Sequence, residues 1–276
     1  MNIRFSKMHG LGNDFMVVDT VNQAVKFTPD QIQRLANRHR GVGFDQLLII
    51  APPKDSTHDF FYQIFNADGS EAYQCGNGAR CIAKYIHDHK LSDKKEFMVA
   101  TKKNKHKLIL ENANTVTVDM GTPVLEPQEI PFKAEAKKNI YTLTITYGDY
   151  NVSVISMGNP HCIFEVDNAN TIDLETIGKT LSEHPQFPHR TNVEFMQVVS
   201  MNHIRLRIYE RGVGETEACG SGACAAVVAG ILQNKLASKV TVTMPGGDLT
   251  VEWNGNNEPV WMTGPAAEVF EGEISL

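Results

Sequence analysis

The sequence predicts a strand-rich α+β fold made of two similar domains. Short runs of alternating apolar and β-branched residues outnumber the helical patterns. A segment of the first half recurs in the second half, which indicates a duplicated domain. The chain has 276 residues, of which 42% are hydrophobic and 21% charged, so it can bury a core and does not resemble a disordered protein.

Short strands are expected on both sides of a segment rich in proline, glutamate and lysine. The strand-like runs are residues 107–110, 115–118, 141–146 and 151–155. A hairpin turn at Gly148 and Asp149 is predicted to lead into the last of these runs. Residues 121–138 carry three prolines and are the closest thing to a linker in the chain.

Two helices are predicted outside the repeated segment. Thr28, Pro29 and Asp30 supply an N-cap, a first-turn proline and an acidic first turn, and the helix is expected to stop near Gly41. Residues 173–182 are typical of its counterpart in the second half. Helices are therefore few, and strands dominate the expected fold.

The repeated segment is the strongest sign of organisation. Residues 64–79 match residues 208–223 at their aromatic, glycine and cysteine positions without a gap. Within these runs Cys75 and Cys219 stand 219 − 75 = 144 positions apart. One repeat of about half the chain is typical of a duplicated domain and not of a solenoid.

A second match supports the same duplication. A Gly-Asn pair ends at Asn13 and again at Asn159, which lie 62 and 60 positions before the repeated cysteines. We expect an N-terminal domain of residues 1–119, to which the C-terminal strand 265–276 is added back. Residues 120–264 are expected to form the C-terminal domain.

Each repeat ends in a Cys-Gly-x-Gly-Ala turn that leads from a strand into a helix. Glycines let the backbone turn tightly and bring its N–H groups close to a ligand. The partial positive charge at a helix N-terminus favours a thiolate, and the same N–H groups can hold a carboxylate. Each turn therefore offers a reactive sulfur beside an anion-binding site.

Duplication would bring the two turns face to face across an interdomain cleft, where small-molecule sites often form. One thiolate would remove a proton from carbon while the other thiol delivers a proton to the opposite face. The result inverts a stereocentre next to a carboxylate. His161 and Glu210 are the candidates for adjusting this pair of thiols. Neither turn contains a lysine, so nothing in them supports a Schiff-base cofactor.

Composition narrows the class of protein. Lys and Arg number 26 against 32 for Asp and Glu, a net charge of −6, which argues against a nucleic-acid binder. No apolar run approaches the roughly 20 residues of a membrane helix, and the N-terminus lacks a signal-peptide core. Five cysteines, an odd number, are typical of free thiols in a reducing cytoplasm. We expect a soluble cytoplasmic protein that binds neither nucleic acid nor membrane.

An ordered set of motifs resembles the diaminopimelate epimerase family. In the first half the motifs are Gly10-Leu11-Gly12-Asn13-Asp14, Gly43-Phe44-Asp45-Gln46, Phe65-Asn66-Ala67-Asp68-Gly69 and Cys75-Gly76-Asn77-Gly78. In the second half they are Gly158-Asn159-Pro160-His161, Arg190-Thr191-Asn192-Val193-Glu194, Tyr209-Glu210-Arg211-Gly212 and Cys219-Gly220-Ser221-Gly222. The likeness covers the chain from about residue 5 to Phe270, and the order and spacing make it specific.

No Cys-x-x-Cys occurs and no nearby histidine pair completes four ligands, so a zinc site is not expected. The resemblance implies an epimerase that interconverts LL- and meso-2,6-diaminopimelate for lysine and peptidoglycan precursor synthesis, with no cofactor. It implies two pseudo-symmetric α+β domains, each a mostly antiparallel sheet wrapped around a central helix, with the active site between them. Cys75 and Cys219 would be the acid/base thiols, and His161 and Glu210 would adjust their pKa values. The matching substrate-binding positions are Asn13, Gln46, Asn66, Gly76, Asn77, Asn159, Asn192, Glu210, Arg211, Gly220 and Ser221.

The implied substrate is consistent with these residues. Diaminopimelate carries two carboxylates and two ammonium groups, so its site needs many fixed polar partners and a cation such as Arg211 for the distant carboxylate. The resemblance also implies a homodimer. Phe270 stands where the family often has a tyrosine linked to the dimer contact, so the details of dimerisation stay open.

Other functions and other roles remain open at the level of sequence. The same fold could serve a proline racemase or hydroxyproline dehydratase, Cys75 and Cys219 could form a reversible redox pair, and the protein could bind amino acids without catalysis. The remaining cysteines are expected to be buried structural thiols: Cys81, Cys162 and Cys224. Five histidines lie in polar stretches and are expected to be solvated: His58, His87, His89, His106 and His184.

Overall fold

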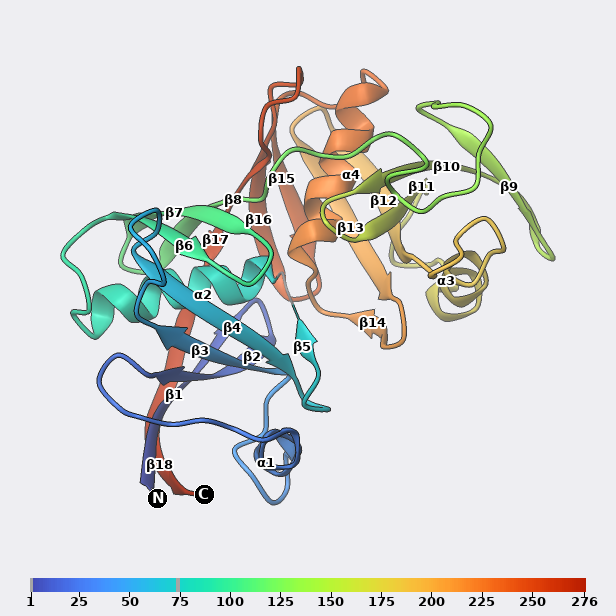
Figure 1. Ribbon diagram of the computed structural model, residues 1–276. Coiled ribbons are helices and arrows are strands. Elements are labelled where there is room, and N and C mark those ends of the chain that lie inside the picture. Colours follow the sequence, from blue (N-terminus) through green and yellow to red (C-terminus); the bar gives the residue numbers. More distant parts are fainter. Residues whose placement is uncertain (1, 73–74) are drawn as a thin grey trace. The chain divides into compact units, whose positions relative to one another are not determined.

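The computed structural model describes residues 2–72 and 75–276, and the chain divides into two compact units (Figure 1). The first unit contains Met1–Asp119 and Thr263–Leu276, and the second contains Met120–Met262. The chain re-enters the first unit 265 − 263 = 2 residues before the position expected from the sequence. Both chain termini therefore belong to the first unit.

The first unit wraps one sheet around a central helix. Its strands are β1 (Asn2–Gly10), β2 (Asn13–Asp19), β3 (Gln46–Ala51), β4 (Phe60–Asn66), β5 (Glu71–Ala72), β6 (Glu96–Ala100), β7 (Lys105–Asn112), β8 (Thr115–Asp119) and β18 (Ala267–Ser275), and its helices are α1 (Pro29–Ala36) and α2 (Gly76–Asp88). β1 pairs antiparallel with β18 and β2, and β3 pairs with β2 in parallel and with β4 antiparallel. β4 also pairs with β5 antiparallel and with β6 in parallel, and β6, β7 and β8 follow antiparallel. Because α2 contacts β1, β2, β3, β7, β8 and β18, it is the core of this unit.

The second unit repeats this arrangement. Its elements are β9 (Tyr141–Ile145), β10 (Gly148–Ser156), β11 (Pro160–Glu165), α3 (Leu174–Ser182), β12 (Asn192–Ser200), β13 (His203–Glu210), β14 (Gly214–Thr216), α4 (Gly220–Leu232), β15 (Lys239–Met244), β16 (Gly247–Glu252) and β17 (Trp261–Pro265), the last of which contains the boundary between the units. β10 pairs antiparallel with β9 and β11, β11 runs parallel to β12, and β12 pairs antiparallel with β13. β13 pairs with β14 antiparallel and with β15 in parallel, as β4 does with β5 and β6. The predicted fold class of two similar, mostly antiparallel units is confirmed.

The two central helices are buried for different reasons. α4 consists of small and apolar residues, and nearly all of them are buried inside the sheet, as expected of a helix without a polar face. α2 buries two charged side chains, but Arg80 donates to the Pro265 carbonyl at 3.0 Å and Lys84 donates to the Ala113 carbonyl at 2.8 Å. These bonds offset the desolvation of the two cations. Among the described residues, none of the helices has both the length and the apolar character needed to cross a membrane.

Two local predictions are wrong in their boundaries. The first helix has the predicted Thr28 cap but ends at Ala36 instead of near Gly41. The Asn37 side chain accepts hydrogen bonds from the backbone N–H groups of His39 and Arg40, and this turn replaces further helix. The hairpin turn lies at residues 146–147, because Gly148 already pairs with Ile145 as the first residue of β10.

The proline-rich segment 121–138 is not a free linker. Val124 forms an antiparallel bridge with Ser156. Ile130 and Phe132 are 1% and 3% exposed and belong to the core of the second unit, where the Phe132 ring packs 4.9 Å from that of Phe187. Proline prevents this segment from becoming a regular strand, but its apolar side chains still fix it to the unit.

Candidate active site

The first cysteine turn places a sulfur at the start of the core helix α2. Cys75 is the N-cap with extended backbone angles, φ −154° and ψ 104°, and its Sγ accepts the Gly78 N–H at 3.3 Å. The thiol donates to Asn13 Oδ1 at 3.7 Å, and the same oxygen accepts from Asn77 Nδ2 at 3.2 Å. A backbone donor and the helix N-terminus both favour negative charge on this sulfur. Tyr73 and Gln74 of the repeated segment lie outside the described residues.

A network of ion pairs holds the strand end that carries Asn13. Asn13 Nδ2 donates to Asp45 Oδ2 at 2.9 Å, and Arg38 contacts both Asp14 and Asp45, at 2.8 and 2.7 Å. Burial alone would raise the pKa of Asp14, but the hydrogen bonds from Arg38 and Lys7 outweigh it and hold that pKa well below its usual range. Asp14 is therefore ionised and fixes the orientation of this edge.

Gln46 and Asn66 lie opposite each other on β3 and β4 at the same sheet edge. Gln46 Nε2 donates to Asn66 Oδ1 at 2.9 Å, and Asn66 Nδ2 donates to Ser70 Oγ at 3.0 Å. Gln46 Oε1 is buried and has no hydrogen-bond partner among the described residues. An amide pair of this kind can offer both a donor and an acceptor to a polar ligand.

The second cysteine turn repeats the geometry with a more buried sulfur. Cys219 is the N-cap of α4 and only 7% exposed, and its Sγ lies 3.5 Å from Ser221 Oγ. Burial raises the pKa of Cys219 well above its usual value, and the carboxylates of Glu210 and Glu194 raise it further. At neutral pH this sulfur is therefore a thiol, suited to donate a proton.

Three further predicted residues lie beside this turn. The Thr216 hydroxyl donates to Glu210 Oε1 at 2.7 Å, which fixes the carboxylate that acts on Cys219. Asn192 Oδ1 accepts the backbone N–H of Arg211 at 3.1 Å. The Arg211 side chain is exposed and donates to the His189 carbonyl at 3.1 Å, so its guanidinium is accessible to an anion.

His161 is held by a carboxylate that the sequence analysis did not select. Its Nδ1 lies 2.6 Å from Glu194 Oε1, its Nε2 lies 3.1 Å from Asn159 Oδ1, and both His161 and Glu194 are 0% exposed. Burial raises the pKa of Glu194. A sequence signal did exist, because Glu194 is the only charged residue among the apolar and amide side chains that begin β12.

The strand register explains why the predicted residues gather within each unit. Parallel pairing of β2 with β3 and antiparallel pairing of β3 with β4 bring the start of two strands and the end of a third to one edge. The group in the first unit is Asn13, Gln46, Asn66, Cys75, Gly76 and Asn77. The group in the second unit, built by β11, β12, β13 and α4, is Asn159, His161, Asn192, Glu210, Arg211, Cys219, Gly220 and Ser221. Each unit thus carries one candidate catalytic cysteine with its own set of polar side chains.

The burial of the remaining cysteines agrees with the prediction, whereas that of the histidines agrees only in part. Cys81, Cys162 and Cys224 are 0% exposed, which confirms the prediction of buried structural thiols. The prediction that five histidines in polar stretches are solvated is wrong for His58 and His106, which are 7% and 5% exposed. Each of these two rings has a backbone partner that offsets its burial: His58 Nε2 accepts from the Lys54 N–H at 3.0 Å, and His106 Nδ1 lies 2.9 Å from the Asp119 carbonyl.

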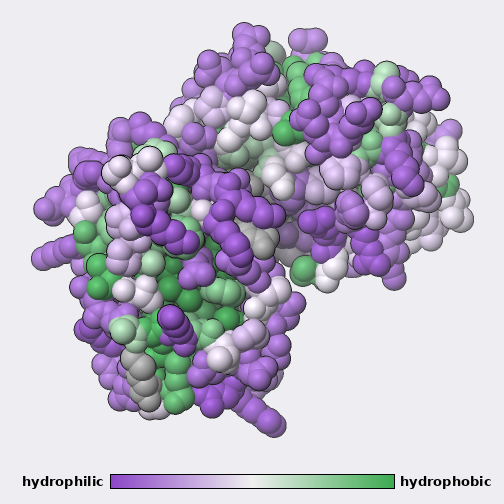
Figure 2. Space-filling model, in the orientation of Figure 1, coloured by the Kyte–Doolittle hydropathy of each residue, from purple (hydrophilic) through white to green (hydrophobic). Residues whose placement is uncertain are grey.

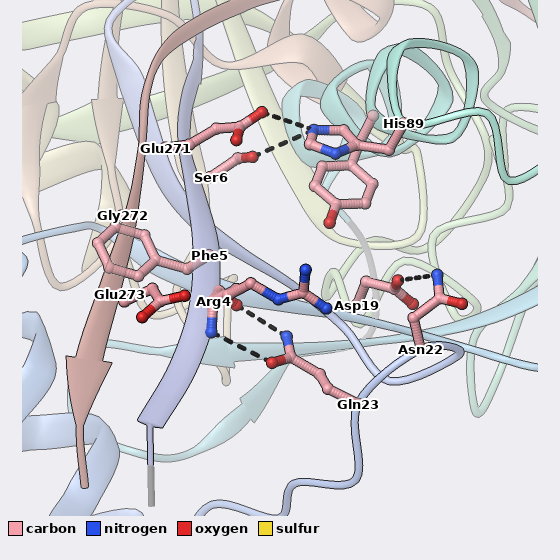
Figure 3. Close-up of a pocket in the computed structure, with 11 residues that line it drawn as sticks. Arg4, Phe5, Ser6, Asp19, Asn22, Gln23, His89, Glu271, Gly272 and Glu273 are labelled. Carbon is pink, nitrogen blue, oxygen red and sulfur yellow. Dashed lines mark hydrogen bonds and ion pairs between the residues drawn. The ribbon is translucent and has the colours of Figure 1, made fainter.

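The first unit also contains an open pocket of about 580 Å³, shown in Figure 3. It is lined by residues of β1, α2, β18 and the segment after β2, and none of the predicted site residues lines it. His89 and Glu271 line this pocket, and their ligand atoms and that of Glu268 all lie within 4.8 Å of one another. Among the described residues this group could hold a metal ion, but His89 Nε2 already lies 3.2 Å from Glu268 Oε2 and 3.3 Å from Ser6 Oγ.

The fold and the site define a class of protein: a duplicated α+β fold in which each unit ends its repeat with a cysteine at the N-cap of its core helix. The chain belongs to the diaminopimelate epimerase family, whose family model matches residues 5–126 and 153–269.

Solved structures of other proteins share this fold across almost the whole chain. A hydroxyproline epimerase from Agrobacterium vitis, solved with bound trans-4-hydroxy-L-proline, is 15% identical, with a TM-score of 0.70 and coverage of 100% of this chain and 93% of that chain. A PhzF-family phenazine biosynthesis protein from Bacillus anthracis is 16% identical, with a TM-score of 0.69 and full coverage of both chains. A methylitaconate-delta-isomerase is 13% identical, with a TM-score of 0.69 and coverage of 99% and 95%. At these identities the structures establish a shared fold.

Proposed function

We propose that the protein is a cofactor-independent epimerase that interconverts LL- and meso-2,6-diaminopimelate, in lysine and peptidoglycan precursor synthesis. Membership of the diaminopimelate epimerase family supports the reaction class and the substrate. The observation that carries the proposal is that Cys75 and Cys219 occupy the N-caps of the two core helices at equivalent positions of the repeat. A reaction that inverts a carbon centre with two bases needs such a pair.

The proposed reaction requires the two sulfurs to reach opposite faces of one α-carbon. In one direction the Cys75 thiolate takes the α-proton, so that a C–H bond breaks and an S–H bond forms. The Cys219 thiol gives its proton to the other face, which leaves a Cys219 thiolate. The reverse direction starts from the Cys219 thiolate and the Cys75 thiol. The α-carboxylate of the substrate binds helix N-terminal N–H groups, which stabilise the negative charge that develops beside it.

The positions of the polar side chains suggest what each does in the proposed reaction. Glu210 keeps Cys219 protonated until the substrate is bound, because its carboxylate disfavours the thiolate. Arg211 binds the distant carboxylate of diaminopimelate, and its exposed guanidinium supports this role. The remaining substrate contacts fall to Asn13, Gln46, Asn66, Asn77, Asn159 and Asn192.

The test uses NMR to measure exchange of the α-proton of LL-diaminopimelate in ²H₂O. No cofactor is added to the reaction. Cys75→Ala and Cys219→Ala should each lower the epimerisation rate by about 1,000-fold or more, because each removes a proton-transfer group. Cys81→Ala removes a buried thiol of the same helix and is the matched control, with the rate retained. Full activity in both alanine variants would overturn the proposal.

A proline racemase is the alternative within the same fold, and the hydroxyproline epimerase structure makes proline and trans-4-hydroxyproline the substrates to compare. Arg211 favours the longer, doubly charged diaminopimelate, which should have the highest kcat/KM of the three. Oxidation of the two thiols separates a redox function from the proposed one, because it should abolish epimerisation. A non-catalytic binder would take up diaminopimelate without ever placing deuterium in it.

We also propose a cytoplasmic homodimer. Val269 and Phe270 on β18 are 58% and 48% exposed, and the Phe270 ring stands edge-on to Phe5 at 6.1 Å. On the face in Figure 2 most side chains are hydrophilic, while hydrophobic ones gather over the unit that carries both termini. Sedimentation should give a dimer for the wild type and a weaker one for Phe270→Ser, while Val213→Ser, which changes another exposed apolar residue, should leave the dimer unchanged.

A further inference from the structure

The two units carry different chemistry at one pair of equivalent positions. In the first unit the pair is Phe15 and Leu48, and in the second it is His161 and Glu194. The equivalence follows from strand register: Phe15 pairs with Gln46 as His161 pairs with Asn192, and Leu48 pairs with Ile64 as Glu194 pairs with Ile208. All four side chains of the two pairs are 0% exposed. An apolar pair in one unit is thus replaced by an ionisable pair in the other.

Each pair lies beneath the first turn of its core helix. A Cβ placed at Gly78 would lie 3.2 Å from a methyl carbon of Leu48. A Cβ placed at Gly222, the equivalent glycine three residues after Cys219, would lie 2.8 Å from Glu194 Oε1. The carboxylate therefore packs directly against the turn that carries the second cysteine.

Stability does not explain the ionisable pair. The first unit shows that Phe15 and Leu48 fill the same place in the same fold. Burying a carboxylate and an imidazole carries a desolvation cost that an apolar pair avoids, so the replacement is neutral or unfavourable for folding. A role in the reaction is the remaining reason to keep a histidine and a glutamate there.

The hydrogen bonds define where the protons are. Asn159 Oδ1 accepts from His161 Nε2, so this nitrogen holds a proton. One further proton lies between His161 Nδ1 and Glu194 Oε1, which are 2.6 Å apart. Glu194 Oε2 is buried and has no hydrogen-bond partner among the described residues. Because His161 is the side chain that hydrogen-bonds this carboxylate, the ring has one orientation.

We propose that Glu194 is a positioning residue for the epimerase reaction: it fixes the His161 ring so that the Nε2–H faces Asn159 at the substrate-binding edge. This inference rests on the proposed function. The groups that face the carboxylate are His161 and Cys162 on β11, and Cys219 at the start of α4, with Glu210 on β13 acting on the same sulfur. Glu194 thereby also opposes a thiolate at Cys219 and makes the two halves of the site chemically unequal.

A double-mutant cycle tests whether Glu194 acts through His161. The variants are Glu194→Leu, His161→Phe and the double variant, which gives the second unit the apolar pair of the first. If Glu194 acts through His161, each single variant lowers kcat by about 100-fold or more and the double variant is no worse than His161→Phe. The double variant should unfold at the wild-type temperature or above, because it leaves no unpaired buried charge. Losses that multiply in the double variant would overturn the proposal.

Glu194→Gln keeps the shape of the side chain and removes its charge. We expect kcat to fall about 10-fold or more, KM to stay within about three-fold, and the pH profile of kcat to change shape. Glu165→Gln changes an exposed residue of β11 that pairs with Lys235 and is the matched control, with an unchanged profile. A wild-type kcat and pH profile in Glu194→Gln would also overturn the proposal.

The ¹⁵N NMR signals of the His161 ring in the free protein separate this inference from the proposed function. In the wild type they should show a protonated Nε2 and a strong hydrogen bond at Nδ1, and Glu194→Gln should change the Nδ1 signal. If the protein epimerises no diaminopimelate, the proposed function fails while this measurement still decides the role of Glu194. Identical ring signals in both proteins would show that Glu194 does not fix the proton.

Discussion

The two units share a strand order and a core helix but differ beneath the N-terminus of that helix. In the first unit Phe15 and Leu48 fill the space, and in the second His161 and Glu194 occupy it with a hydrogen bond of 2.6 Å. Duplication supplies two sulfurs in the same local frame. A two-base reaction needs one thiolate and one thiol at a time, and different surroundings decide which sulfur holds the proton in the free protein.

The sulfurs themselves differ in the same sense. Cys75 is partly exposed and accepts the Gly78 N–H at 3.3 Å, whereas Cys219 is 7% exposed and lies near Glu210. The first environment favours a thiolate and the second favours a thiol. The polar pair beneath α4 and the burial of Cys219 therefore both favour a thiol at Cys219.

Moving the ionisable pair into the first unit should produce the largest change in stability. Leu48→Glu buries an unpaired carboxylate and is expected to lower the free energy of unfolding by about 4 kcal/mol. Adding Phe15→His should recover part of this loss, since the two side chains can then pair as Glu194 and His161 do. Urea unfolding of both variants checks this. A double variant less stable than Leu48→Glu alone would show that the two positions are not equivalent.

The glycines above the two pairs should respond unequally to the same change. Gly222→Ala places a methyl group 2.8 Å from a carboxylate oxygen, whereas Gly78→Ala places one 3.2 Å from a flexible leucine side chain. We expect losses of about 2 kcal/mol for Gly222→Ala and about 1 kcal/mol for Gly78→Ala. Epimerisation should also fall further in Gly222→Ala, because Glu194 is displaced. Equal effects on stability and activity would remove this distinction between the units.

The two units should also differ in how their contribution to the free energy of unfolding depends on pH, because of Asp14. It stands in the first unit where the second has Pro160, and it pairs with Lys7 and Arg38. Its pKa is lowered on folding, so its contribution is complete above the unfolded value near 4 and is lost as pH falls through the folded value. Asp14→Asn should cost about 2 kcal/mol at pH 7 and less below about pH 4, measured by denaturant unfolding across pH. A cost that is constant with pH would contradict the ion-pair account.

The rates at which Cys75 and Cys219 are alkylated should show the smallest difference between the two units. At pH 8 iodoacetamide is expected to modify Cys75 about ten-fold faster than Cys219, because Cys219 is buried and its pKa is raised. Cys81 and Cys162 should stay unmodified in the folded protein. Mass spectrometry of peptides at timed intervals gives the order. Faster reaction at Cys219 would reverse the assignment of thiolate and thiol.

Local signals predicted much of this molecule from its sequence. The Cys-Gly-x-Gly turns predicted where both core helices begin, because the glycines of a turn act within a few residues. Glu194 escaped prediction because its partner lies on β11, and only the pairing of β11 with β12 brings the two together. The turn before Gly148 and the burial of Ile130 likewise depend on strand register and core packing, which a linear pattern does not contain.

The central claim is that one sulfur takes the α-proton and the other supplies a new one. Conversion of unlabelled LL-diaminopimelate in ²H₂O, stopped after a small fraction has reacted, measures this directly by mass spectrometry of each isomer. The account predicts meso product with one deuterium at the inverted carbon and unlabelled remaining substrate, because the donating thiol has exchanged with solvent. Product that retains the original hydrogen would show that a single base carries the proton across, and would contradict the account.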